Sequence, residues 1–68
     1  MKNKLEKFYR LSAVQELTGL KRSKIREMVA VGAFPKPIPL CDSGRAIGWL
    51  ESELVAWQQA QIRKRPRG

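Results

Sequence analysis

The sequence predicts a small, mainly α-helical domain with one β-hairpin, and three observations indicate this fold class. Two short segments with helical spacing of apolar residues are joined by a tight glycine turn, which has the proportions of a helix-turn-helix. A proline-rich segment follows that can form only an edge strand of a short hairpin. A third helical segment then closes the domain. With 68 residues the chain forms one domain and has little room for an enclosed catalytic pocket.

The first helix is expected to begin at Ser12 and to end at Thr18-Gly19. Ser12 is a suitable N-cap, because its hydroxyl can accept a backbone amide while Gln15, three residues later, reaches back to the amide of the cap. Val14 and Leu17 then mark one apolar face. The helix is therefore short and amphipathic.

The second helix is expected to begin around Lys21-Arg22. Gly32 is a natural left-handed C-cap, and Phe34-Pro35 prevents the helix from continuing. Its apolar stripe consists of residues spaced by three and four: Ile25, Met28 and Val29. The opposite face carries Arg22, Ser23, Arg26 and Glu27.

A short hairpin is expected over residues 35–49. Three prolines at alternate positions within 35–39 exclude a helix and remove amide donors, so this segment is at best an edge strand. Residues 41–44, with the sequence Cys-Asp-Ser-Gly, supply the turn, and residues 45–49 can return as the partner strand.

The third helix is expected from Leu50 to about Arg63. Glu51 and Glu53 lie in its first turn, where the helix dipole favours acids, and Arg63 lies at its end, where the dipole favours cations. One stripe of this helix contains Leu50, Leu54, Trp57 and Gln61. The aromatic residues expected in the core, rather than stacked on bases, are Phe34, Trp49 and Trp57.

Positive charge is concentrated in three blocks. The formal charge is +8, and residues 1–10, 21–30 and 61–68 carry most of it. Such an excess of positive charge points to a polyanionic partner. The predicted organisation is a flexible basic N-terminus over 1–8, a winged helix-turn-helix domain of three helices plus a wing over 9–63, and a basic tail over 64–68.

The second helix carries candidate DNA-binding residues. A helix-turn-helix places the N-terminal residues of its second helix against base edges in the major groove of DNA. Arg22, Ser23 and Arg26 are the candidates for base contact, because the planar fork of Arg matches the two acceptors of guanine. Lys21 and Lys24 are expected to act as point charges toward phosphate. The alternative is that this face is simply solvated.

The hairpin is expected to serve as a wing, which lies along a minor groove or a phosphate strand. Its candidate contacts are Lys36, Ser43 and Arg45, and Arg10 completes the predicted set. The alternative reading is a lid that covers the core through Ile38, Leu40 and Ile47, and both roles are compatible.

Several classes of protein are excluded by composition. The chain has one Cys and no His, so neither a disulfide framework nor a zinc site is expected, and no metal or cofactor is predicted. Cys41 is expected to do no more than fill its loop. The absence of His, of a glycine-rich phosphate loop and of paired inward carboxylates argues against an enzyme. Without an apolar span or a signal peptide core, the protein is expected in the cytoplasm.

Three motifs carry a resemblance to a known family: the turn Thr18-Gly19-Leu20, the step Phe34-Pro35-Lys36-Pro37 and the helix start Gly48-Trp49-Leu50-Glu51-Ser52-Glu53. From about Tyr9 to Arg63 the chain resembles the AlpA family of prophage regulators. The resemblance implies a MerR-like winged helix without an effector domain. It also implies action on phage or integrated-element DNA, as a transcription regulator or as an excisionase that assists a site-specific integrase.

The leading hypothesis is a non-enzymatic, sequence-specific protein that binds double-stranded DNA. With no obvious coiled-coil seam, the chain is expected to be a monomer in solution that binds cooperatively to neighbouring repeats and bends them. The alternatives are a basic RNA-binding module and a protein-interaction adaptor. RNA binding is disfavoured because no sheet carries stacking aromatics, and membrane binding because the apolar helix faces are needed for the core.

Overall fold

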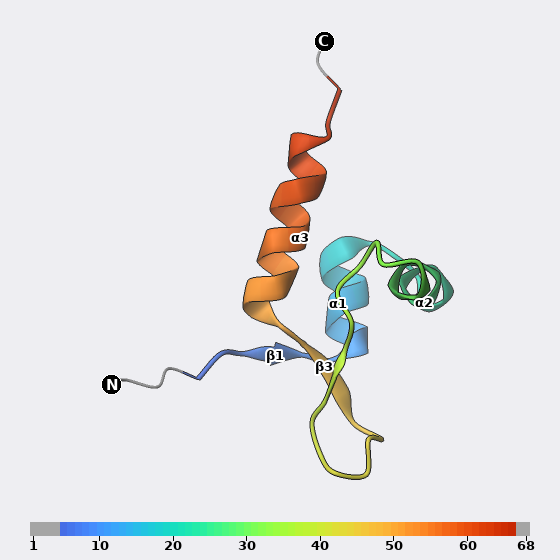
Figure 1. Ribbon diagram of the computed structural model, residues 1–68, viewed down its shortest axis with the longest axis vertical. Coiled ribbons are helices and arrows are strands. Elements are labelled where there is room, and N and C mark those ends of the chain that lie inside the picture. The colour runs from blue at the N-terminus through green and yellow to red at the C-terminus, as the bar shows by residue number, and fades with distance from the viewer. Residues whose placement is uncertain (1–4, 67–68) are drawn as a thin grey trace.

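A computed structural model describes residues 5–66 and confirms a mainly α-helical fold with a small hairpin (Figure 1). The elements, in chain order, are β1 (Phe8–Tyr9), α1 (Leu11–Thr18), α2 (Arg22–Ala30), β2 (Ile38–Pro39), β3 (Ile47–Leu50) and α3 (Glu51–Arg63). We call β2, β3 and the connecting residues 40–46 the wing. The fold is that of a small winged helix: α1 and α2 form the helix-turn-helix, and α3 extends away from the wing (Figure 1).

The structure of α1 corrects one prediction, which concerns its N-terminal end. Arg10 is the N-cap and no side chain caps the first turn, so the predicted capping role of Ser12 is wrong. Val14 is fully buried, as its spacing predicts, but Leu17 is 63% exposed. Leu17 stays exposed because it lines a groove between α1 and α3 that neither helix fills.

The two helices of the helix-turn-helix end as the glycines predict. Gly19, with φ of 77°, ends α1 and donates to the carbonyl oxygen of Gln15 at 2.8 Å. Gly32, with φ of 78°, follows α2, and the amides of Gly32 and Ala33 donate to carbonyl groups in the last turn of that helix. This Schellman pattern satisfies the free carbonyl groups and reverses the chain toward the wing.

The sheet has three strands in the order β1-β3-β2, all antiparallel. The pairing of Ile38 with Gly48 confirms the predicted hairpin, although the return strand begins at Ile47 rather than at residue 45. Gly48 suits the central strand, because a Cβ atom there would lie 3.2 Å from both the Tyr9 carbonyl oxygen and a Leu40 methyl group. β1 was not predicted, since two residues show no alternation that a sequence reader could detect.

Residues before β1 complete the start of α3. The Lys7 carbonyl accepts the Glu51 amide at 3.0 Å, and a Glu6 carboxylate oxygen accepts the Ser52 amide at 3.2 Å. These bonds supply the cap that Leu50, the N-cap residue, does not provide with its own side chain. Of the predicted basic ends, residues 1–4 and 67–68 lie outside the described residues.

The core centres on four buried side chains, Val14, Ile25, Phe34 and Trp49. Met28, Val29, Leu54 and Trp57 pack against them while remaining partly exposed. The predicted stripe of α2 and the predicted aromatic core are thereby confirmed. In the described part of the chain, no helix has both the length and the apolarity needed to span a membrane.

Candidate nucleic-acid interface

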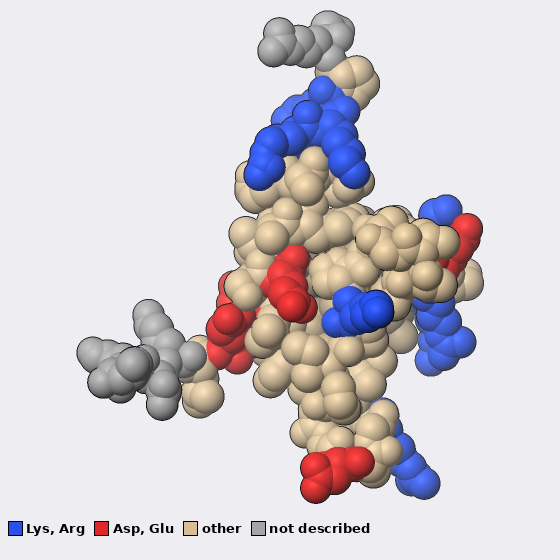
Figure 2. All heavy atoms as spheres, in the orientation of Figure 1, with Lys and Arg blue, Asp and Glu red and all other residues tan. Residues whose placement is uncertain are grey.

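Basic side chains are visible over α2, at the tip of the wing and at the C-terminal end of α3 (Figure 2). The nine residues predicted as DNA contacts are all exposed: Arg10, Lys21, Arg22, Ser23, Lys24, Arg26, Lys36, Ser43 and Arg45. Exposure leaves each of them available to a ligand, and their positions divide them into two sets.

The first set consists of four arginines, Arg10, Arg22, Arg26 and Arg45, which line one open cavity of about 650 Å³. The cavity lies between the start of α1, the exposed side of α2 and the wing, and we call it the arginine cavity. Three separate segments of the chain therefore contribute the same chemical group to one concave surface.

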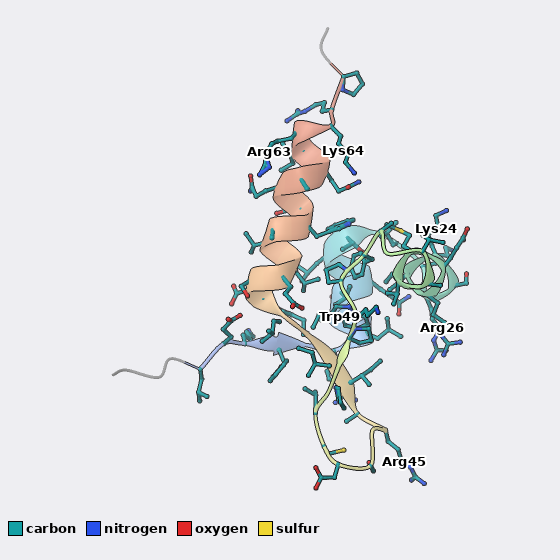
Figure 3. All side chains as sticks on the ribbon, in the orientation of Figure 1. Lys24, Arg26, Arg45, Trp49, Arg63 and Lys64 are labelled. Carbon is teal, nitrogen blue, oxygen red and sulfur yellow. The ribbon has the colours of Figure 1, made fainter. Side chains whose placement is uncertain are left out.

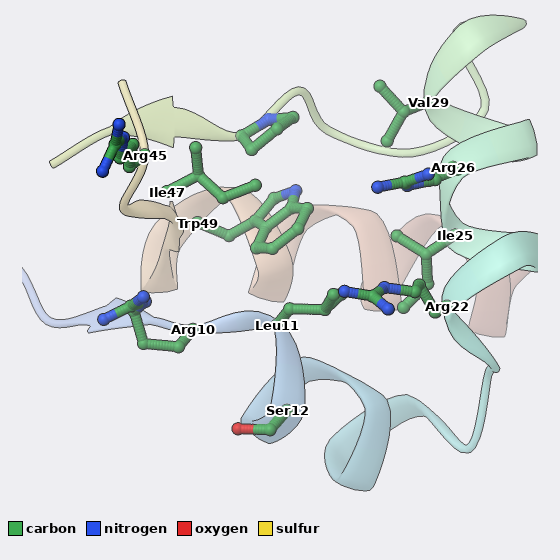
Figure 4. A pocket seen from close by; sticks show the side chains of 11 residues that line it. Arg10, Leu11, Ser12, Arg22, Ile25, Arg26, Val29, Arg45, Ile47 and Trp49 are labelled. Carbon is green, nitrogen blue, oxygen red and sulfur yellow. The ribbon is translucent and has the colours of Figure 1, made fainter. Parts of the chain in front are cut away.

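Local structure explains why these side chains converge. Arg22 and Arg26 are four residues apart on α2, so they leave the helix on the same side, and both point from α2 toward Trp49 (Figure 4). Arg45 lies next to the wing turn, and Arg10 is the N-cap of α1. Arg45 from the wing and Arg10 from the start of α1 therefore line the side of the cavity opposite α2.

The position of Arg22 and Arg26 modifies one prediction. The sequence predicts them opposite the apolar stripe of α2, but they line the arginine cavity together with Ile25 and Val29. They therefore flank the stripe on the side of the wing. The helical period allows this, because residues 22 and 26 are one turn apart and each is only three residues from a member of the stripe.

The cavity carries a concentrated positive charge. No carboxylate contributes to its lining. Among residues 5–66 the ion pair on α2 joins Lys24 Nζ and a Glu27 oxygen at 3.8 Å, and neither Arg22 nor Arg26 takes part in one. Guanidinium groups that share a concave surface without carboxylates attract an anion with several oxygens, and phosphate suits their fork geometry.

The floor of the cavity is apolar. Its lining includes Leu11, Pro37, Ile47 and Trp49, of which Trp49 is only 2% exposed. The indole is fixed by a 2.7 Å hydrogen bond to the Pro35 carbonyl oxygen. The arginine cavity thus combines four exposed guanidinium groups with an apolar floor.

Ser12 belongs to this cavity and was missed as a site residue. The sequence predicts it as a helix cap, but in the structure its own helix start is not capped by a side chain. The first backbone amides of α1 thus have no side-chain acceptor at an end of the helix that favours anions. The signal that could have identified Ser12 is the neighbouring Arg10, a predicted contact that lies at the same helix start.

The second set of predicted residues lies outside the cavity lining: Lys21, Ser23, Lys24, Lys36 and Ser43. Lys24 and Arg26 leave α2 on different sides, and only Arg26 points toward the side where Arg45 lies (Figure 3). The structure therefore does not bring the predicted lysines together with the arginines.

The wing tip carries an unusual thiol. The exposed Cys41 Sγ lies 3.1 Å from Ser43 Oγ. Hydrogen bonding with that hydroxyl, followed by bonds from backbone groups of the turn, lowers the pKa of Cys41 to about 7 from its usual 9.0. Sequence reasoning assigned no special property to this residue, because the shift depends on the folded turn. In the described chain, no group of three or more His, Cys, Asp or Glu side chains could hold a metal ion.

Comparison with known proteins adds two findings. The sequence model of the family described as "Prophage CP4-57 regulatory protein (AlpA)" matches residues 7–62. A relative from Enterobacteria phage P4, described as "Uncharacterized protein ORF88", is 41% identical over 63 residues, which cover 93% of this chain and 69% of the relative. No solved structure matches the chain.

Proposed function

Because the chain belongs to the AlpA family of prophage regulatory proteins, we propose that it regulates phage or mobile-element DNA by binding a specific duplex sequence. The observation that carries this proposal is the arginine cavity, where Arg10, Arg22, Arg26 and Arg45 converge between α2 and the wing. A DNA strand that borders the major groove carries the negative charge that these four arginines attract.

In the proposed complex α2 enters the major groove. Its first turn presents Arg22 and Ser23, and its second turn presents Arg26, which we assign to a base edge. Arg10 and Arg45, on the other side of the cavity, bind phosphates of the same strand. Two kinds of contact from one cavity fix both the position of the protein and the bases that it reads.

The lysines make a weaker contribution to DNA binding, which does not depend on the DNA sequence. Lys21, Lys24 and Lys36 are exposed outside the cavity lining and supply point charges toward the flanking backbone. Ser43 at the wing tip is a further candidate for a phosphate contact. The free chain is proposed to be a monomer that binds neighbouring repeats cooperatively and bends the DNA.

The biological role is either transcription regulation or assistance to a site-specific integrase as an excisionase, and both need only binding. DNase I footprinting on DNA that flanks the protein's own gene separates them. Protection over a promoter supports a regulator, and protection inside an attachment region together with bending supports an excisionase. Protection nowhere, with equal affinity for duplex DNA and RNA of any sequence, overturns the proposal of specific DNA binding.

A further inference from the structure

An apolar surface remains uncovered on the side of α3 that faces the groove between α1 and α3. Val55 and Ile62 on α3 are 48% and 44% exposed, and Leu17 on α1 is 63% exposed. Val55 and Ile62 are seven residues apart, so they lie two turns from each other on one face of the helix. Leu17 and Val55 both line the groove, which has a volume of about 150 Å³. We call this surface the α3 face.

Charge is distributed along α3 in a polarised manner. Glu51 and Glu53 lie in its first turn, and Arg63, followed by Lys64 and Arg65, lies at its end. Acidic side chains gather beside the start of the helix and basic ones over its far end (Figure 2). Glu51 also lines the groove, so the α3 face is acidic at one end and adjoins cations at the other.

We propose that the α3 face binds the same face of a second copy of this chain, with the two α3 helices antiparallel. In that arrangement Val55 of one copy lies beside Ile62 of the other, and the reverse pairing follows by symmetry. The start of each helix then meets the end of its partner, so that Glu51 approaches Arg65 of the second copy. A parallel arrangement would place like charges together. It would also set the two helix dipoles side by side in the same direction, which is unfavourable.

The occupant is a second copy because the surface complements itself. An apolar patch with a purely acidic rim would call for a basic partner, but here Glu51 lies four residues before Val55, and Arg65, just beyond the end of α3, lies three residues after Ile62. Each copy supplies the group that the other lacks. The patch is small compared with the interface of a stable dimer, so the association is weak in free solution.

The contact has a consequence for DNA that rests on the proposed function. A two-fold contact between copies requires two binding sites related by the same symmetry, which means an inverted repeat. DNA that holds two copies side by side raises their effective concentration, so a weak contact becomes cooperative binding. The α3 face thus selects the orientation of neighbouring sites.

Sedimentation equilibrium of the full chain without DNA tests the contact itself. The wild-type protein is expected to pass from monomer to dimer as its concentration rises. Ile62→Glu, Glu51→Arg and Arg65→Glu should each weaken this association about tenfold or more, which corresponds to losing at least ~1.4 kcal/mol. The matched controls Glu53→Arg and Lys64→Glu reverse the same charges two residues from Val55 and Ile62, on the other side of α3, and should leave the association unchanged.

Mixing the variants tests the antiparallel pairing. Glu51→Arg and Arg65→Glu should each associate more weakly than wild type when alone, but a mixture of the two should regain the association, because each mixed pair places opposite charges together at both ends. Circular dichroism establishes that each variant is folded. A wild-type chain that stays monomeric at all concentrations, mixed variants that do not associate, or growth beyond a dimer overturns the proposal.

A DNA titration separates this proposal from DNA binding. On a single site Ile62→Glu should bind as tightly as wild type, and on an inverted repeat it should lose cooperativity. Normal binding to a single site with unchanged cooperativity contradicts the α3 contact and leaves specific DNA binding intact. Loss of single-site binding by a folded Ile62→Glu protein also contradicts the proposal, because it places the α3 face at the DNA.

Discussion

The indole nitrogen of Trp49 donates a 2.7 Å hydrogen bond to the carbonyl oxygen of Pro35, and this bond joins the central strand of the sheet to the segment that leads from α2 to the wing. Trp57 makes an equivalent 3.0 Å bond to the carbonyl oxygen of Ala33. Phe34, between the two acceptors, packs edge-on against both indoles. Trp49 therefore ties the wing, and Trp57 ties α3, to the segment that follows α2.

Replacement of Trp57 tests this clamp. Trp57→Ala removes packing on Phe34 and the bond to Ala33, and it should lower the free energy of unfolding by about 3 kcal/mol, the lower end for such changes because the side chain is only partly buried. Urea denaturation followed by circular dichroism measures the change. The control Trp57→Phe keeps most of the packing and should lose about 1 kcal/mol for the bond. Equal stability of all three proteins would contradict the role of Trp57 in closing the core.

Arg26 and Lys24 are expected to differ in their effect on DNA specificity. Arg26→Ala should cost about 1–3 kcal/mol on the cognate site and relax preference at one base position. Lys24→Ala should weaken all sequences alike and only slightly, because Lys24 lies outside the arginine cavity and is already paired with Glu27. Affinity measurements over a set of single-base site variants distinguish the two. The assignment of Arg26 to a base fails if both substitutions change every site by the same factor.

DNA binding should weaken steeply with salt, because the arginines displace condensed counterions from the phosphates. The slope of log affinity against log salt is expected to be roughly −0.9 for each phosphate neutralised. Fluorescence anisotropy over a salt series gives this slope, and Arg45→Ala should reduce it by about 1 if Arg45 binds a phosphate. An affinity that does not respond to salt would remove the electrostatic basis of the proposed interface.

Alkylation of Cys41 should reveal the lowered pKa of its thiol. The thiolate is the reactive form, so the rate of reaction with iodoacetamide should reach half its maximum at a pH of about 7. Ser43→Ala removes the largest cause of the shift and should move the midpoint upward toward 9.0. A wild-type midpoint near 9.0, or a midpoint unaffected by Ser43→Ala, would show that the turn does not form this hydrogen bond.

The helices and the wing could be predicted because their signals are local. Gly19 and Gly32 end α1 and α2 through a backbone conformation that few other residues adopt, and the alternate prolines restrict residues 35–39 to an edge strand. Two features could not be predicted because they depend on distant partners. β1 exists through its pairing with β3, and Leu17 is exposed because α3 does not cover it.

The candidate site was predicted in its chemistry but not in its shape. Charge and helix position identified Arg22, Arg26 and Arg45, and the structure places them in one cavity. Their convergence depends on how α2 lies relative to the wing, and the Trp49 bond to Pro35, which is 14 residues away in sequence, ties the wing to the segment after α2. The lysines were selected by the same charge rule as the arginines. The helical period places Lys24 and Arg26 on different sides of α2, but it does not show which side faces the wing.

The junction between β3 and α3 has a mechanical consequence. Leu50 ends the strand and Glu51 begins the helix with no residue between them, and the Lys7 carbonyl holds the joint from the side. The central strand and the terminal helix are thus joined without a linker, and we call the pair the rod. If DNA tilts the wing, the rod turns with it, and a helix about 20 Å long acts as a lever arm whose free end moves further than its pivot. A shape change sensed at the duplex would reach the far end of α3 without any flexible linker to absorb it.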